Sequence, residues 1–176
     1  MPVDIDQVFS RGGTELIELL NYCVRSVQMD PIFGFLVEEY RLCPTASKTV
    51  ALYDMFLAPE APARINAAPL LPPREQSLQI LIQNFRSGVA TPAVAPRRNI
   101  QPGKSLFDTL VLHIRMNRRG SMAKIRRRYN PKRSATENLP GGKMTAGQRR
   151  FVEQVWQPRV RPVLVLAGFR RIANIA

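Results

Sequence analysis

Histidine, cysteine and tryptophan are scarce in this sequence. Its 176 residues include one His, two Cys and one Trp. Zinc sites are built from several His or Cys ligands and a disulfide framework needs paired cysteines, so neither is expected to hold this fold together. Cys23 and Cys43 lie twenty residues apart without a metal-ligand pattern. We expect both to be buried as small apolar side chains.

Long apolar runs are also missing. No stretch approaches the roughly 20 apolar residues that a membrane-spanning helix needs, so no membrane span is predicted. The first six residues, Met-Pro-Val-Asp-Ile-Asp, are acidic and lack the basic and apolar regions of a secretory signal. We therefore expect an intracellular protein, in the cytoplasm or nucleus, or a component of a virion, rather than a secreted one.

A convincing catalytic set is absent. Residues 103–105, Gly-Lys-Ser, resemble the end of a phosphate-binding loop, but Arg98 occupies the position of its first glycine. His113 is the only histidine and has no carboxylate partner nearby in the sequence. Glu38 and Glu39 are adjacent, so they point to different sides of a helix. We predict no enzyme activity, no cofactor, no bound metal and no small-molecule substrate.

Positive charge is abundant and unevenly distributed. The formal net charge is +13. Residues 1–96 contain seven Lys or Arg and ten Asp or Glu, whereas residues 97–176 contain nineteen and three. An anionic partner is indicated, either nucleic acid or a membrane surface. We divide the chain into a near-neutral helical assembly region, 1–96, and an Arg-rich nucleic-acid-binding region, 97–176.

Arginine supplies most of this charge, with 21 Arg against five Lys. The planar guanidinium binds phosphate through two hydrogen bonds and stacks on bases, which suits RNA or DNA. A GC-rich gene would raise the arginine content as well. The composition favours neither explanation and does not distinguish RNA from DNA.

The apolar spacing predicts a mainly α fold with five to six short helices separated by Pro-rich connectors. The connectors are residues 58–73, which include five prolines, and residues 89–103. The C-terminal region is expected to be basic and extended, with one short strand over the β-branched residues 160–166 as a further expectation. The expected helices are 14–29, 30–43, 45–57, 74–87, 105–117 and one from residue 145 to its end at Pro158, with the basic stretch 121–129 as a further candidate for a short helix.

Several helix starts carry capping signals. Thr14 and Thr45 are predicted N-caps, and Thr145 with Gln148 forms the pattern of a capping box. Segment 45–57 is apolar almost all round, which is typical of a deeply buried helix or an interface. Tyr53, Phe56 and Leu57 are not expected to fit one small core face, so we predict that this segment, Phe56 included, contributes to a self-association surface.

Residues 115–133 form the strongest candidate binding element. Nine of the nineteen side chains are cationic and none is acidic. If helical, the cations spread over more than one face, which favours an arm that wraps phosphates over a helix that reads bases. Tyr129 follows three arginines and is a candidate for stacking on a base. The candidate phosphate contacts are Arg115, Arg118, Arg119, Lys124, Arg126, Arg127, Arg128, Lys132 and Arg133.

A second basic element contains Lys143, Arg149 and Arg150, which we also predict to contact RNA. Aromatic residues among cations suit single-stranded nucleic acid. The helical spacing of Phe151 and Trp156 nevertheless favours a place in the core for both.

This element resembles a known viral motif. Residues 142–150, Gly-Lys-Met-Thr-Ala-Gly-Gln-Arg-Arg, followed by Trp156 and residues 159–165, are similar to the RNA-binding basic arm that opens bromovirus coat proteins. The resemblance implies an RNA-binding arm of a capsid protein. In this chain the motif lies near the other end, and no series of jelly-roll strands follows it.

These patterns together predict a self-associating RNA-binding protein of the viral nucleocapsid or coat type. A ribosomal or other ribonucleoprotein subunit is the first alternative. The second is a host-directed interaction protein whose basic run serves only as a targeting signal. Self-association separates the first two, and the last predicts no RNA binding at physiological salt.

Overall fold

The described part of the chain is mainly helical and contains no strand, which confirms the predicted class for these residues. The computed structural model describes residues 7–8, 11–65, 76, 79–80, 82–83, 86–87 and 121–175. Its α-helices are α2 (Gly13–Arg25), α3 (Met29–Leu42), α4 (Ala46–Leu52), α7 (Ser121–Arg128), α8 (Ala146–Phe151) and α9 (Arg161–Leu166). The π-helical segments are η1 (Tyr53–Leu57) and η3 (Val152–Val160), and the 3-10 turns are η2 (Pro140–Gly142) and η4 (Arg171–Asn174).

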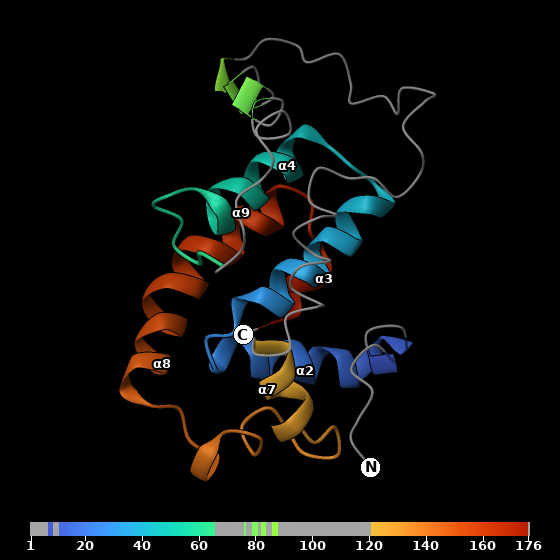
Figure 1. The fold of residues 1–176 in the computed structure, drawn as a ribbon, viewed down its shortest axis with the longest axis vertical. Helices are drawn as coiled ribbons and strands as arrows, with labels where there is room; N and C mark the ends of the chain where they lie inside the picture. The colour runs from blue at the N-terminus through green and yellow to red at the C-terminus, as the bar shows by residue number, and fades with distance from the viewer. Residues whose placement is uncertain are drawn as a thin grey trace.

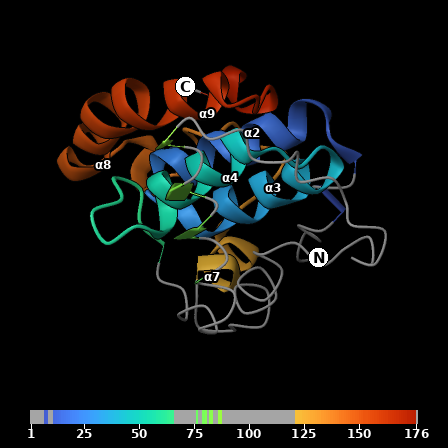
Figure 2. The same cartoon turned by 90° about the horizontal axis from the view of Figure 1, so that it is seen from above.

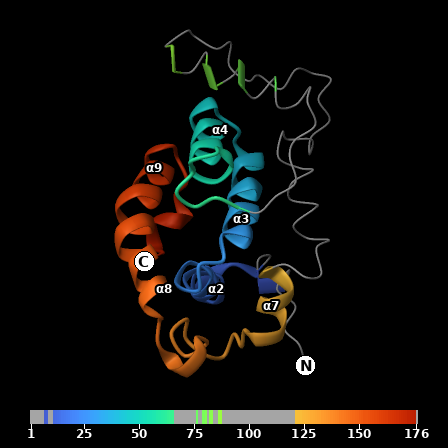
Figure 3. The same cartoon turned by 60° about the vertical axis from the view of Figure 1, so that its left-hand side comes forward.

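The helices form three layers (Figure 1). Helices α2, α3 and α4 follow one another through the middle of the molecule. The continuous helix α8–η3–α9 covers one side of this middle layer, and α7 covers the other, as Figures 2 and 3 show. Contacts of α7 with α3, of η3 with α2 and of α9 with α4 hold the layers together.

Helix α2 ends in a Schellman motif. The backbone N–H of Gln28 donates to the carbonyl of Cys23 at 2.8 Å, and that of Val27 donates to Val24 at 3.1 Å. This geometry requires a left-handed residue at Val27, whose φ is 55°. Glycine normally fills such a position, so the β-branched Val27 holds local backbone strain. At the other end of α2 the predicted Thr14 cap is wrong, because Gly12 is the N-cap.

Helix α4 begins as the sequence predicts, because the Thr45 hydroxyl accepts a hydrogen bond from the Lys48 N–H at 3.2 Å. The apolar segment continues into η1, where Phe56 is fully buried and meets Phe33 edge-on with ring centroids 5.6 Å apart. Phe56 is therefore a core residue, and its proposed place on a self-association surface is wrong.

The segment after η1 folds back on it. The N–H groups of Ala63 and Ile65 each donate at 3.0 Å to carbonyls of η1, and both side chains are buried. Of the expected helix 74–87, the described residues up to Arg86 are helical, and buried Ile82 lies on its apolar face. The expected helix 105–117 and the connector residues 66–73 and 89–103 lie outside the described residues.

The long C-terminal helix buries every fourth residue: Val152, Trp156, Val160 and Leu164. An α-helix with about 3.6 residues per turn would rotate this stripe away from the core. The π-helical segment η3 holds more residues per turn and compensates, so the stripe stays on one face. The wider helix also accommodates Pro158, which lacks the N–H that an α-helix needs.

Two predictions about this region are therefore wrong. The helix does not stop at Pro158, and residues 160–166 belong to α9 rather than to a strand. The region that resembles a viral basic arm is a packed helix. The β-branched residues Val160 and Val163 favour strands locally, but the packing of the apolar stripe against α2 and α4 outweighs that preference.

The C-terminal turn is anchored on the middle layer. The Lys48 ammonium donates to the carbonyl of Cys43 at 3.1 Å and lies 5.6 Å above the ring of Phe169. The Glu39 carboxylate accepts a hydrogen bond from the Arg170 N–H at 3.1 Å. The described parts of the near-neutral and basic regions thus share one hydrophobic core, and the division at residue 96 describes the charge rather than the packing.

Candidate nucleic-acid interface

Helix α7 confirms the short basic helix predicted at 121–129. Ile125 and Tyr129, four residues apart, are buried and fix the helix on α2 and α3. Arg126, Arg127 and Arg128 lie between them and are exposed. The spacing of the two anchors therefore forces the three arginines outward. The structure makes this stretch a docked helix, in contrast to the free arm that its charge suggested.

Tyr129 does not serve as a stacking platform. Its side chain is 5% exposed, and its ring lies 5.3 Å from the ring of Tyr22. The Tyr129 hydroxyl is buried with no hydrogen-bond partner among the described residues. A base would have to displace Tyr22 to reach this ring. The prediction that Tyr129 stacks on a base is therefore wrong for this structure.

The loop after α7 carries Lys132 and Arg133, both exposed. The Asn138 side chain ties the loop together. Its Oδ1 accepts from the Asn130 N–H at 2.7 Å, and its Nδ2 donates to the carbonyls of Asn130, Arg133 and Ser134 at 3.0 to 3.1 Å. The hydrogen bonds of Asn138 thus fix the backbone of the loop that carries Lys132 and Arg133.

The same loop is also fastened to α2. The Glu18 carboxylate accepts from the Ala135 N–H at 2.6 Å, and the Arg25 guanidinium donates to the Thr136 hydroxyl at 2.5 Å. Inside the loop the Glu137 carboxylate accepts from the Ser134 N–H at 2.7 Å, which lowers the pKa of that carboxyl. The two acids near the loop, Glu18 and Glu137, therefore bind its backbone, while Lys132 and Arg133 are exposed to solvent.

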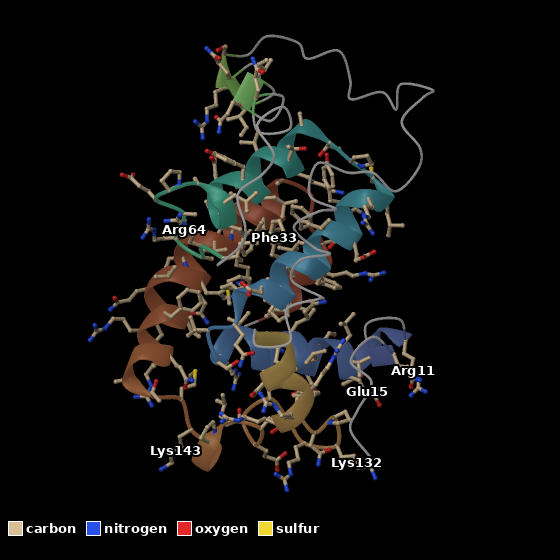
Figure 4. The ribbon with its side chains drawn as sticks, viewed as in Figure 1. Arg11, Glu15, Phe33, Arg64, Lys132 and Lys143 are labelled. Carbon is tan, nitrogen blue, oxygen red and sulfur yellow. The ribbon has the colours of Figure 1, made fainter. Side chains whose placement is uncertain are left out.

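Lys143, Arg149 and Arg150 lie beyond the next turn and are exposed. The capping box predicted for α8 is present, with the Thr145 hydroxyl accepting from the Gln148 N–H at 3.1 Å and the Gln148 side chain accepting from the Thr145 N–H at 2.8 Å. Figure 4 labels Lys132 and Lys143 at the same end of the molecule, with Arg64 well away from both.

The basic surface is defined here as the exposed side chains Arg128, Lys132, Arg133, Lys143, Arg149 and Arg150. None of them forms an ion pair with a residue that the structure describes. Arg126 and Arg127 are exposed but already interact with other groups. Arg115, Arg118, Arg119 and the side chain of Lys124 lie outside what the structure describes.

Burial confirms the predictions for Trp156 and Cys23 and contradicts the one for Cys43. Trp156 is fully buried, which confirms its predicted place in the core, and its indole N–H has no partner among the described residues. Cys23 is buried, and burial raises the pKa of its thiol, whereas Cys43 is exposed, contrary to prediction. His113 lies outside the described residues.

The described residues contain no group of three or more His, Cys, Asp or Glu side chains that could hold a metal ion. None of their helices is long and apolar enough to cross a membrane. Comparisons of the chain with protein-family models, with curated proteins and with solved structures find no match.

Proposed function

We propose that this protein binds RNA by neutralising its phosphates with the basic surface. The observation that supports this most is the set of six exposed cations without an ion-pair partner, carried on two helices and on an ordered loop. Exposed cations that no acid neutralises attract a polyanion and release its counterions on binding. DNA phosphates would bind the same cations, so the choice of RNA over DNA rests on the resemblance of residues 142–165 to a viral RNA-binding arm.

The placement of the aromatic residues favours contacts to the sugar-phosphate backbone over stacking. Tyr129, Trp156 and Phe169 are each no more than 5% exposed. Bases therefore cannot stack on these rings, and the exposed cations of the basic surface are left to contact phosphates. We propose binding with little dependence on base sequence, as suits a nucleocapsid or coat protein that must cover any RNA.

The test is a salt titration of affinity for a labelled single-stranded RNA, measured by fluorescence anisotropy. The double variant Lys132→Ala/Arg133→Ala removes two charges from the ordered loop. Loss of two phosphate contacts should lower the slope of log affinity against log salt by about 1.4. The matched control is Arg64→Ala/Arg86→Ala, which also removes two charges but leaves the basic surface intact.

The control variant should retain the wild-type slope, since Arg64 lies away from the loop and Arg86 is already paired with Asp54. Equal slopes for all three proteins would refute the assignment of this loop. Absence of binding by the wild type at physiological salt would refute the RNA-binding function and favour the targeting-signal alternative.

Self-association is the second half of the nucleocapsid proposal. Light scattering of the protein with and without RNA tests it directly. A nucleocapsid protein should form larger particles when RNA is added, whereas a ribosomal subunit should add only its own mass to the RNA. We propose the first outcome.

A further inference from the structure

The outer face of α9 exposes a cluster of aliphatic side chains. Leu166 is 89% exposed, Val165 39% and Val163 36%. Single exposed aliphatic residues are ordinary, but here three occur within four residues and exposed Pro162 adjoins them. The buried stripe of the same helix points the other way, through Leu164. Helix α9 is therefore apolar on both its inner and its outer side.

Arginines flank this cluster in the sequence. Arg159, Pro162, Val163 and Leu166 are spaced i, i+3, i+4 and i+7, which places them along one side of the helix. Arg170 and Arg171 follow the turn at the end of α9. The three arginines are exposed and form no ion pair within the described residues. Residues 154–176 contain no Asp or Glu at all.

The cluster is held in place from below. Gly168 turns the chain with φ of 109°, Phe169 enters the core, and the Arg170 N–H is bound by Glu39. The other Glu39 oxygen is buried, and Glu39 forms no ion pair with Arg159, Arg170 or Arg171. Leu166 stands directly before this fixed turn, which keeps its side chain in solvent.

We propose that this surface, Arg159 to Arg171 with Leu166 at its tip, docks on an anionic lipid bilayer. Aliphatic side chains gain by entering the boundary between headgroups and acyl chains, while the guanidinium groups bind headgroup phosphates. RNA supplies phosphates but no apolar layer that would cover Leu166. A second copy of the chain would bring two sets of unpaired arginines together, which like-charge repulsion opposes.

Co-sedimentation of the full chain with vesicles tests the proposal. Vesicles of phosphatidylcholine alone are compared with vesicles containing phosphatidylserine. The wild type should bind the second kind and not the first, with affinity that falls as salt rises. Leu166→Ser should weaken binding about tenfold through lost apolar burial. Arg170→Ala and Arg171→Ala should each weaken it about fivefold.

The matched control is Ile80→Ser, which removes another aliphatic side chain that is 52% exposed. It should bind the anionic vesicles as the wild type does. Binding to neither kind of vesicle, equal binding to both kinds, or the same loss in Leu166→Ser and Ile80→Ser would each overturn the proposal. Melting curves should show all these variants folded, since the replaced side chains are exposed.

Two other occupants are distinguished by the same variants. If a second copy covers the cluster, light scattering will show a larger mass for the wild type than for Leu166→Ser, which contradicts lipid docking. If RNA covers it, Leu166→Ser will lose RNA affinity while keeping that for vesicles. The Lys132→Ala/Arg133→Ala variant should lose RNA affinity and retain vesicle binding, so failure of either proposal leaves the other testable.

Discussion

The Tyr22–Tyr129 pair offers a test of whether the basic helix α7 is docked as the structure has it. Tyr129→Ala removes a buried ring and should destabilise the fold by about 3 kcal/mol. Tyr129→Phe keeps the ring and removes a buried hydroxyl that has no partner among the described residues. Loss of that desolvation cost should stabilise the fold by about 1 kcal/mol. For a chain of this size, the melting temperature should fall by about 9 °C and rise by about 3 °C, respectively.

The pH dependence gives an independent signature. Burial, with a smaller contribution from the Glu18 carboxylate, raises the pKa of Tyr129 above its ordinary value of 10.0. Above pH 10 the unfolded phenol therefore ionises first, the unfolded state holds fewer protons, and stability falls as pH rises. The wild type should lose up to about 1.4 kcal/mol per pH unit more than Tyr129→Phe in this range.

Urea unfolding at pH 8, 10 and 11 measures both effects, and RNA affinity at pH 7.5 completes the assay. The expected result is that Tyr129→Phe binds RNA as the wild type does, because the ring lies in the core. A Tyr129→Ala protein that melts like the wild type but loses affinity for single strands would refute the reasoning and restore Tyr129 as a stacking residue.

Three further predictions follow from backbone geometry and from the loop. Val27→Gly relieves the left-handed backbone strain at the end of α2. After the extra entropy of glycine in the unfolded chain is subtracted, the free energy of unfolding should rise by about 0.5 kcal/mol. Thermal melts test this, and a lower melting temperature would contradict it. Gly168→Ala should cost at least about 1 kcal/mol in the same assay, because φ is 109° and the new Cβ would lie 3.3 Å from Lys48 Cε; an unchanged melt would mean that the turn relaxes. Asn138→Ala removes no charge but removes the hydrogen bonds that order the loop of Lys132 and Arg133. Fluorescence anisotropy should show RNA affinity weakened about fivefold, because the loop must then be ordered on binding. Wild-type affinity would show that the order of this loop does not affect binding.

The sequence predicted those elements whose signal is local. The capping residues Thr45 and Thr145 form the hydrogen bonds that their positions suggest, because a cap depends only on residues within one turn. The apolar periodicity of α2 and α3 likewise anticipated the buried faces. One local signal failed, since Gly12 rather than Thr14 is the N-cap of α2. The strand predicted over residues 160–166 failed because of contacts between distant segments. Val160 is buried in a helix because η3 packs on α2 and α9 packs on α4, and no local propensity reveals this packing.

The candidate site shows the same division. The distribution of charge predicted that the binding cations lie in residues 97–176. It did not predict that Arg128 is exposed while the next residue, Tyr129, is buried. The spacing of Ile125 and Tyr129, four residues apart, was a usable signal for an inward face. Ser134 and Glu137 likewise have the spacing of a capping box, which marks an ordered loop. Nothing in the sequence indicates that Asn138 joins three backbone carbonyls across that loop.

The anchoring of the C-terminal turn has a consequence for how the chain folds during synthesis. Phe169, Ile172 and Ile175 are fully buried in the same core as helices α2, α3 and α4, which are made more than a hundred residues earlier. Until these residues leave the ribosome, α2, α3 and α4 expose the apolar surface that the last helix will bury, and partly folded chains with such exposed surface are prone to misfold. A chain interrupted before Phe169 should therefore be recognised by chaperones and proteases as unfolded, and only chains that extend through this turn would present the basic surface on a stable scaffold.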